Sequence, residues 1–182
     1  MYYNIYIGGE KWIKVYHFPQ LQPQKWSKND KSVKLYERRV IIVSFVGSFP
    51  HSLDAKKRVF IPAKYREELG AEFYITRKFD PYLSIYTAKD WEEFVEQISS
   101  LPESEAAELQ EYLLGAAQKC VPDSNGRIIL DEKLMQHASI TKNVVFVGAG
   151  KQIKIWAEEV WSKRESQRDP AAIRELMRKY GL

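Results

Sequence analysis

The chain has 182 residues, of which 45% are hydrophobic and 13% aromatic, enough to build the core of one or two small domains. Its single cysteine, Cys120, excludes an intramolecular disulfide, and no apolar run approaches the roughly 18 residues of a membrane span. The polar N-terminus does not resemble a signal peptide, so we expect a cytoplasmic protein without a membrane partner.

The net charge of +4 is concentrated near the N-terminus. Residues 1–43 contain eight Lys and Arg against three Asp and Glu, which leaves twenty basic and twenty-one acidic residues in the rest of the chain. A nucleic-acid surface must therefore come from local clustering. The densest basic cluster is the stretch 47–66, in which five basic side chains accompany one Asp.

Residues 1–43 form an N-terminal extension that is rich in Tyr, Trp and Lys. Two interpretations stay open: a basic, aromatic arm that stacks on bases or lies along phosphates, or the product of a misread start codon, with the native start at Val43. Hints of alternation in residues 2–7 and 12–16 predict a short hairpin around Gly8-Gly9.

From residue 40 the pattern is typical of strands, and 48–90 reads as strand, loop, strand, helix, strand, strand. Pro50 restricts the first strand to a sheet edge or an irregular stretch. Pro62 is suited to the start of a helix that Gly70 ends. The last two strands, 73–76 and 83–86, are expected to form a hairpin across Asp80-Pro81.

A second copy of this pattern occupies 117–160. In both copies an Asp precedes an Arg by four residues, and three apolar residues follow the Arg. The likeness continues from 73–76 to 144–147, from 83–86 to 153–156 and from Trp91 to Trp161. Each copy has about 45 residues, which is small for an independent core, so we expect each half to need a partner in order to fold.

Helical spacing predicts a linker at 91–116 and a helical tail at 161–182. Asp90 is the predicted N-cap of the first linker helix, and Pro102 opens the second. Residues 170–180 form a predicted amphipathic helix, which either packs on a neighbour or adds basic charge.

The phrases SLDAKKRVFIPAKYRE, EYLLGAAQ and PDSNGRIILDEKLMQHASI resemble the two halves of the MraZ family of bacterial transcriptional regulators, over about 45–161. The resemblance implies a mainly β, α+β fold of two tandem AbrB-like (SpoVT-AbrB) swapped-hairpin half-units, 48–90 and 117–160, with linking and C-terminal helices. It also implies a homo-oligomeric ring in the nucleoid that binds repeated elements of double-stranded promoter DNA. Repression of its own promoter, in the division and cell-wall gene cluster, is a further implication.

Three residues are expected to shape the loops of the repeated motif. Asp54 and Asp123 enter tight turns, where an Asp side chain accepts hydrogen bonds from backbone N–H groups two or three residues on. Gly126 supplies a positive φ in an Asn-Gly turn. In the first copy Lys57 stands where the family has Gly, at a cost of about 1 kcal/mol if φ is positive, which puts the usual loop conformation in doubt.

The predicted DNA-binding residues are Lys56, Lys57, Arg58 and Arg127. Each Arg either folds back onto its Asp or points outward, where its planar fork matches phosphate oxygens or the O6/N7 edge of guanine. The two lysines favour an outward Arg58. Arg127 lacks such neighbours, so an intramolecular pair or a subunit contact stays open for it.

No catalytic pattern is evident. His17, His51 and His137 are far apart in sequence, and Cys120 has no nucleophile signature and is expected in a buried strand. Phosphate-binding and nucleophile-elbow motifs are absent. We therefore expect no enzyme, catalytic residue, metal, cofactor or small-molecule substrate. The alternative to a DNA-binding regulator is a structural or protein-binding ring without specific DNA recognition.

Overall fold

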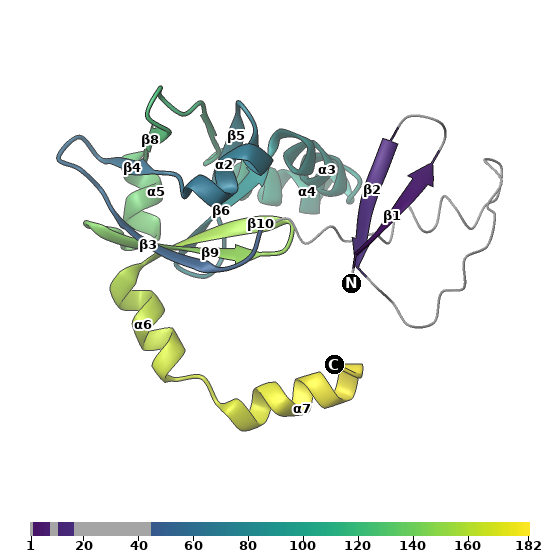
Figure 1. Ribbon diagram of the computed structural model, residues 1–182. Coiled ribbons are helices and arrows are strands. Elements are labelled where there is room, and N and C mark those ends of the chain that lie inside the picture. The colour runs from purple at the N-terminus through teal and green to yellow at the C-terminus, as the bar shows by residue number, and fades with distance from the viewer. Residues whose placement is uncertain (1, 8–10, 17–44) are drawn as a thin grey trace. The chain divides into compact units, whose positions relative to one another are not determined.

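A computed structural model describes residues 2–7, 11–16 and 45–182 (Figure 1). The chain divides into two units, Met1–Ile42 and Val43–Leu182. In the first unit, β1 (Tyr2–Ile7) and β2 (Lys11–Tyr16) form an antiparallel hairpin, as the alternating pattern predicts. Most of the strand predicted from residue 40 lies outside the described residues.

The first repeat has its elements in the predicted order: β3 (Ser48–Ser52), β4 (Arg58–Phe60), α2 (Ala63–Leu69), β5 (Phe73–Arg77) and β6 (Tyr82–Thr87). The predicted boundaries of α2 are confirmed. Pro62 is its N-cap, and Gly70 ends it at φ 75°, a left-handed conformation that glycine adopts without steric cost.

The second repeat has the same order: β7 (Gln118–Cys120), β8 (Arg127–Ile129), α5 (Glu132–His137), β9 (Asn143–Ala149) and β10 (Gln152–Ala157). Between the repeats lie α3 (Ala88–Ser99), α4 (Glu103–Leu109) and the π-helical turn η1 (Gln110–Leu114). After them come α6 (Glu158–Ser166) and α7 (Pro170–Tyr180).

One predicted helix cap is wrong. Asp90 lies inside α3, and the N-cap is Thr87, whose hydroxyl oxygen accepts a hydrogen bond from the Asp90 backbone N–H (3.1 Å). The Thr87 hydroxyl donates in turn to Asp90 Oδ2 (2.7 Å). Both residue types cap helices, and here they do so as a pair, with the threonine three positions earlier.

The two repeats exchange strands. The six-stranded sheet has the order β3-β9-β10-β6-β5-β7, so β3 of the first repeat pairs with the second-repeat hairpin, and β7 of the second repeat pairs with the first. The two hairpins meet at β6 and β10. A separate ribbon pairs β4 with β8. The arrangement has an approximate two-fold relation, and Pro50 lies on an edge strand, as predicted.

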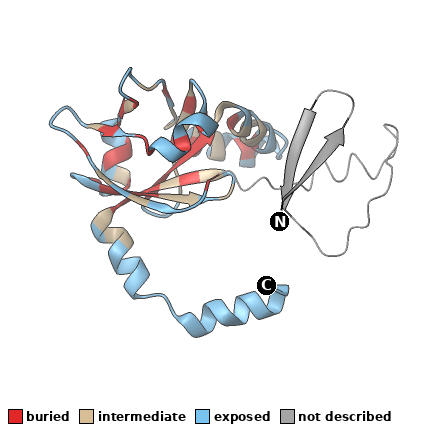
Figure 2. Cartoon of the chain, viewed as in Figure 1, coloured by how far each residue is buried: buried red, intermediate tan, exposed pale blue. Residues whose placement is uncertain are grey.

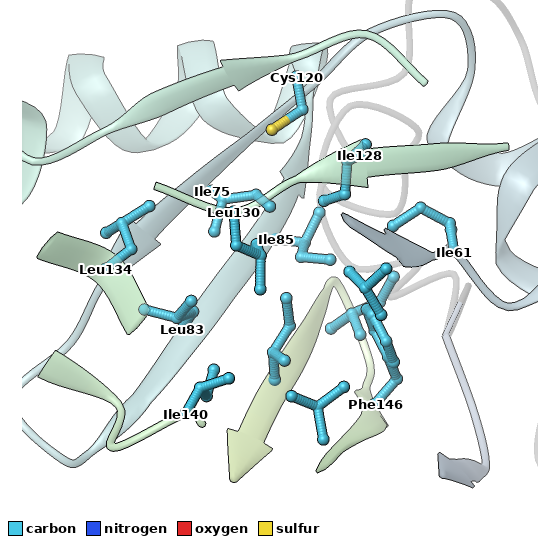
Figure 3. Packing of buried hydrophobic residues seen from close by; sticks show 14 of the residues in the cluster. Ile61, Ile75, Leu83, Ile85, Cys120, Ile128, Leu130, Leu134, Ile140 and Phe146 are labelled. Atoms are coloured by element: carbon cyan, nitrogen blue, oxygen red, sulfur yellow. The ribbon is translucent and has the colours of Figure 1, made fainter. Parts of the chain in front are cut away.

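The core draws on both repeats. Val59 of β4 faces Ile128 of β8 across the ribbon, and both are buried. Around them, isoleucines and leucines from the hairpins and from the chain following each ribbon strand converge (Figure 3). The buried residues in Figure 2 accordingly follow the strands of both halves. Cys120 lies buried in β7, as predicted.

The other face of the sheet is aromatic, and it repeats the same symmetry. Trp91 of α3 packs against Tyr86 of β6 with ring centres 6.0 Å apart. Trp161 of α6 packs against Trp156 of β10 at 5.9 Å. The sequence correspondence between the two tryptophans is therefore a structural one. No helix in the described part of the chain is long and apolar enough to cross a membrane.

Candidate nucleic-acid interface

The first motif loop is built around the Asp54 carboxylate. Its Oδ1 accepts hydrogen bonds from the backbone N–H groups of Lys56 (2.8 Å) and Arg58 (3.0 Å). Its Oδ2 accepts one from Arg58 Nε (2.7 Å) and lies 2.6 Å from Nη2 of the same guanidinium. The aspartate thus holds the loop backbone with one oxygen and the arginine side chain with the other.

The second motif loop repeats this arrangement. Asp123 Oδ1 accepts from the backbone N–H groups of Asn125 and Arg127, both at 2.9 Å. Oδ2 accepts from Arg127 Nε (2.8 Å) and pairs with Nη2 (2.7 Å). The two loops are equivalent in their hydrogen bonds, although their intervening sequences share no residue.

The third residue after each Asp has a positive φ in both loops: 57° at Lys57 and 77° at Gly126. Each donates its backbone N–H to the carbonyl of its Asp, at 3.0 and 2.7 Å. Lys57 therefore keeps the turn that the second loop makes with glycine, and the doubt raised by its side chain does not hold. Left-handed backbone costs a residue with a Cβ about 1–2 kcal/mol.

Each loop is supported by the opposite repeat. Ile61 donates its backbone N–H to the Gly126 carbonyl (2.9 Å), and Leu130 donates to the Lys57 carbonyl (3.1 Å). Arg66 of α2, whose Nε donates to the Ile61 carbonyl, fills the space beside Gly126. A Cβ on Gly126 would lie 2.6 Å from the Arg66 guanidinium carbon.

The ribbon brings the two predicted arginines to one surface. In the β4–β8 register, Arg58 faces Ile129, and Phe60 faces Arg127. Because side chains alternate along a strand, these four residues share the face turned away from the core. The structure thus unites sites that lie far apart in the sequence, each with an arginine held by its own aspartate.

Phe60 and Ile129 were missed in the sequence analysis. Each lies two residues after its motif arginine, and they remain 45% and 59% exposed. The Arg127 guanidinium carbon lies 5.7 Å from the centre of the Phe60 ring. The alternation of a strand could have identified both, because the first and third apolar residues after each Arg are buried and the second must point outward.

The lysines of the first loop differ in their partners. Lys57 Nζ lies 3.2 Å from a carboxylate oxygen of Glu132, at the start of α5. Lys56 is exposed and has no acidic side chain within ion-pair distance among the described residues. The second loop has Asn125 and Gly126 at these two positions, so the positive charge of the interface is concentrated at the first loop.

The arginines set the ionisation of both aspartates. Hydrogen bonds from Arg58, first from its side chain and then from its backbone, lower the pKa of Asp54 to about 2. Arg127 does the same to the pKa of Asp123, also to about 2. Both carboxylates therefore stay charged, and hold their arginines, well below neutral pH.

In the part of the chain that the structure describes, the other reactive groups do not gather into a site. Burial raises the pKa of the Cys120 thiol to about 12, so the sulfur is protonated at neutral pH and a poor nucleophile. Among the described residues, no three His, Cys, Asp or Glu side chains are placed to hold a metal ion.

The family model described as "MraZ protein" matches residues 44–110 and 113–175, one match for each repeat. The chain belongs to the MraZ family. The tandem matches and the antiparallel sheet together confirm the predicted mainly β, α+β fold of two repeated MraZ half-units.

Relatives named "Transcriptional regulator MraZ" align over most of their own length. The protein of Lachnoclostridium phytofermentans is 39% identical over 139 residues, which cover 76% of this chain and 98% of the relative. That of Carboxydothermus hydrogenoformans is 40% identical over 121 residues, or 65% and 84% of the two chains. That of Clostridium acetobutylicum is 34% identical over 141 residues, or 76% and 99%.

The two positive-φ positions should differ in how strongly substitution affects stability. Lys57→Gly removes the left-handed strain, but it frees the unfolded chain and removes an exposed ion pair, so the free energy of unfolding should change by less than about 1 kcal/mol. Gly126→Ala adds strain and displaces the Arg66 guanidinium, and should cost at least about 2 kcal/mol. Urea unfolding at one protein concentration, followed by tryptophan fluorescence, measures both. Equal effects would contradict the loop geometry.

The two aspartates should titrate far below 3.8, the ordinary pKa of an Asp side chain. Because folding lowers these pKa values, the stabilisation is complete above pH 3.8 and is lost as the pH falls toward 2. Carboxyl carbon NMR should place the Asp54 and Asp123 midpoints near pH 2. Arg58→Ala should raise the Asp54 midpoint toward 3.8 and shift the Asp123 midpoint much less, because Arg58 acts on Asp123 through its charge alone and on Asp54 also through hydrogen bonds. If the Asp54 midpoint stays the same in Arg58→Ala, Arg58 does not hold the carboxylate.

Proposed function

We propose that this chain is a sequence-specific, DNA-binding transcriptional regulator that reads double-stranded DNA with the exposed face of the β4–β8 ribbon. One observation carries the proposal: two equivalent Asp-held arginines, Arg58 and Arg127, lie on the same outward face of a two-stranded ribbon. An antiparallel ribbon fits the major groove of B-DNA, where an arginine can bond both O6 and N7 of guanine.

The Asp–Arg pair and an outward contact are compatible. In both loops the aspartate binds the edge of the guanidinium formed by Nε and Nη2. The edge formed by Nη1 and Nη2 still has hydrogens to donate, and a guanine presents two acceptors at matching spacing. A guanidinium already fixed by its aspartate loses less side-chain entropy on binding, because its orientation is set in advance.

A single ribbon offers few cations, so we further propose that copies assemble into a homo-oligomeric ring on repeated operator elements. Affinity for DNA grows with the number of phosphates contacted, and joined weak sites gain from high effective concentration. The relatives are named transcriptional regulators. Repression of its own promoter in the division and cell-wall gene cluster is the regulatory role we assign to the ring, in the cytoplasm and on the nucleoid.

Arg58→Ala and Lys56→Ala should weaken binding in different ways. With a duplex carrying the region upstream of its own gene, Arg58→Ala should lower affinity about 5- to 150-fold, the worth of a bidentate contact, and change affinity for an unrelated duplex much less. Lys56→Ala should weaken binding to both duplexes by a similar factor. It should also lower the number of counterions released on binding, read from the salt dependence of the affinity, by about one. Fluorescence anisotropy across a salt series measures both effects.

Lys163→Ala, an exposed cation on α6, serves as the matched control, and light scattering verifies that assembly is intact. If wild-type protein does not discriminate the two duplexes, a structural or protein-binding ring replaces our proposal. If the full chain binds and a chain beginning at Val43 does not, the basic N-terminal extension is the DNA element.

Phe60 should contribute to sequence preference through the methyl group of thymine, which apolar side chains contact in the major groove. Replacing operator thymines one at a time by deoxyuridine removes only that methyl group. At a contacted position the wild-type affinity should fall several-fold, and Phe60→Ala should bind the two duplexes equally. Phe79→Ala, which removes an exposed aromatic ring outside the ribbon, should keep the wild-type difference. If Phe60→Ala also keeps the difference in affinity between the thymine and deoxyuridine duplexes, Phe60 does not contact the thymine methyl group.

A further inference from the structure

The last helix, α7, is sharply delimited at both ends. Asp169 caps its N-terminus by accepting a hydrogen bond from the Ala171 backbone N–H (2.8 Å), and Pro170 occupies the first turn. At the other end Gly181 turns left-handed at φ 71°, and Leu182 donates its N–H to the Met177 carbonyl (2.9 Å). The local sequence therefore specifies a complete helix of eleven residues.

This helix buries none of its residues in the single chain (Figure 2). Its apolar side chains recur at i, i+3, i+4 and i+7 and are 45–69% exposed: Ile173, Leu176, Met177 and Tyr180. An isolated helix of this length is marginal in water, because most helical stability in proteins comes from packing an apolar face. The same spacing is the one with which helices dock into grooves.

The chain also carries an apolar cavity of about 350 Å³ at the C-terminal end of α2. Its apolar lining comes from both repeats: Ile61, Leu69, Phe73, Val121 and Pro122. Val121 is 67% exposed at this site. Arg66 also lines the cavity, but its Nε donates to the Ile61 carbonyl and its guanidinium lies beside Gly126.

Acidic side chains lie beside the cavity, and basic side chains flank the apolar stripe of α7. At about 100° per residue, Arg174 and Lys179 fall on either side of the apolar stripe of α7. Glu67 and Glu68 lie on α2 immediately before the cavity. Burial, and then the neighbouring Glu67 carboxylate, raise the pKa of Glu68, so a cation placed there would relieve the repulsion of two adjacent acids. Lys64 opposes part of this effect.

We infer that α7 of one copy docks its apolar face into the α2 cavity of a second copy. Helix and cavity are formed by different residues of the chain, so the contact is head-to-tail, and repetition of such contacts closes a ring when the rotation permits. DNA phosphates would bind the cations of α7 but would leave its apolar stripe uncovered. The inference rests on the homo-oligomer proposed above and names the surfaces that build it.

Two variants of the full chain each disable one side of this contact. Leu176→Glu with Met177→Glu places carboxylates on the apolar stripe, and Val121→Lys places a cation at the cavity mouth, opposite Arg174 and Lys179. Light scattering should show assemblies for the wild type and the 21.3 kDa single chain for each variant. Ala171→Glu, on the opposite face of α7, should assemble as the wild type does.

Mixing the two variants gives the decisive result. One retains an intact cavity and the other an intact helix, so the mixture should form a one-to-one complex of twice the single-chain mass. A mixture that stays at the single-chain mass, or a helix variant that still assembles, would overturn the inference. A wild type that stays at the single-chain mass would also overturn the inference, whether or not its α7 binds vesicles of anionic phospholipid.

Anisotropy on the upstream duplex separates this inference from the proposed function. Single-chain variants should still bind, more weakly, because their ribbon is intact while the multiple attachment is lost. If the wild type assembles through α7 but does not bind DNA, the proposed regulatory function is wrong and the docking inference stands. If the variant with Leu176→Glu and Met177→Glu still assembles and binds DNA, the docking inference is wrong and the proposed function stands.

Discussion

The exchange of strands between the repeats is the constraint on which the rest of this structure depends. Every buried backbone N–H and C=O needs a partner, and neither repeat supplies enough strands to satisfy its own hairpin. The β5–β6 hairpin is bordered by β7 of the second repeat, and the β9–β10 hairpin by β3 of the first. The hydrophobic cluster is shared in the same way, so the two halves form a single core.

The ribbon that carries the arginines is a product of this exchange. Asp54 and Arg58 are four residues apart, and a loop of that length can build their contact by itself. The placement of Arg127 beside Phe60 is different, because it requires β8 to pair with β4 and Val59 to pack on Ile128 beneath it. Local sequence therefore orients each guanidinium, and the shared core brings the two onto one surface.

This division explains what could be predicted from the sequence. The order and boundaries of the elements follow from local signals, such as Pro62 and Gly70 around α2. Because the pattern occurs twice, the prediction for each copy supports the prediction for the other. Pairing between repeats depends on contacts remote in sequence, and the resemblance to the MraZ family, not periodicity, supplied the swapped arrangement. The N-cap of α3 was misplaced because Thr87 and Asp90 are both good capping residues, and their order is decided by the backbone.

The positive φ of Lys57 could not be decided from sequence either, because a lysine tolerates that conformation only when other contacts outweigh its strain. Here the opposite repeat provides them: Leu130 bonds the Lys57 carbonyl, and Glu132 pairs with its side chain. In the second loop the Arg66 guanidinium occupies the space where a side chain would lie, so any residue other than glycine must displace it.

That asymmetry bears on how the ribbon meets DNA. Two equal loops related by a two-fold axis would match a palindrome, as dimeric readers match paired half-sites. The two loops have the same backbone conformation but differ in charge, since the first carries Lys56 and Lys57 where the second carries Asn125 and Gly126. A ribbon that reads DNA as proposed therefore has a direction along the groove. The proposed head-to-tail assembly repeats that direction from copy to copy, which suits operator elements repeated in one orientation and disfavours inverted ones.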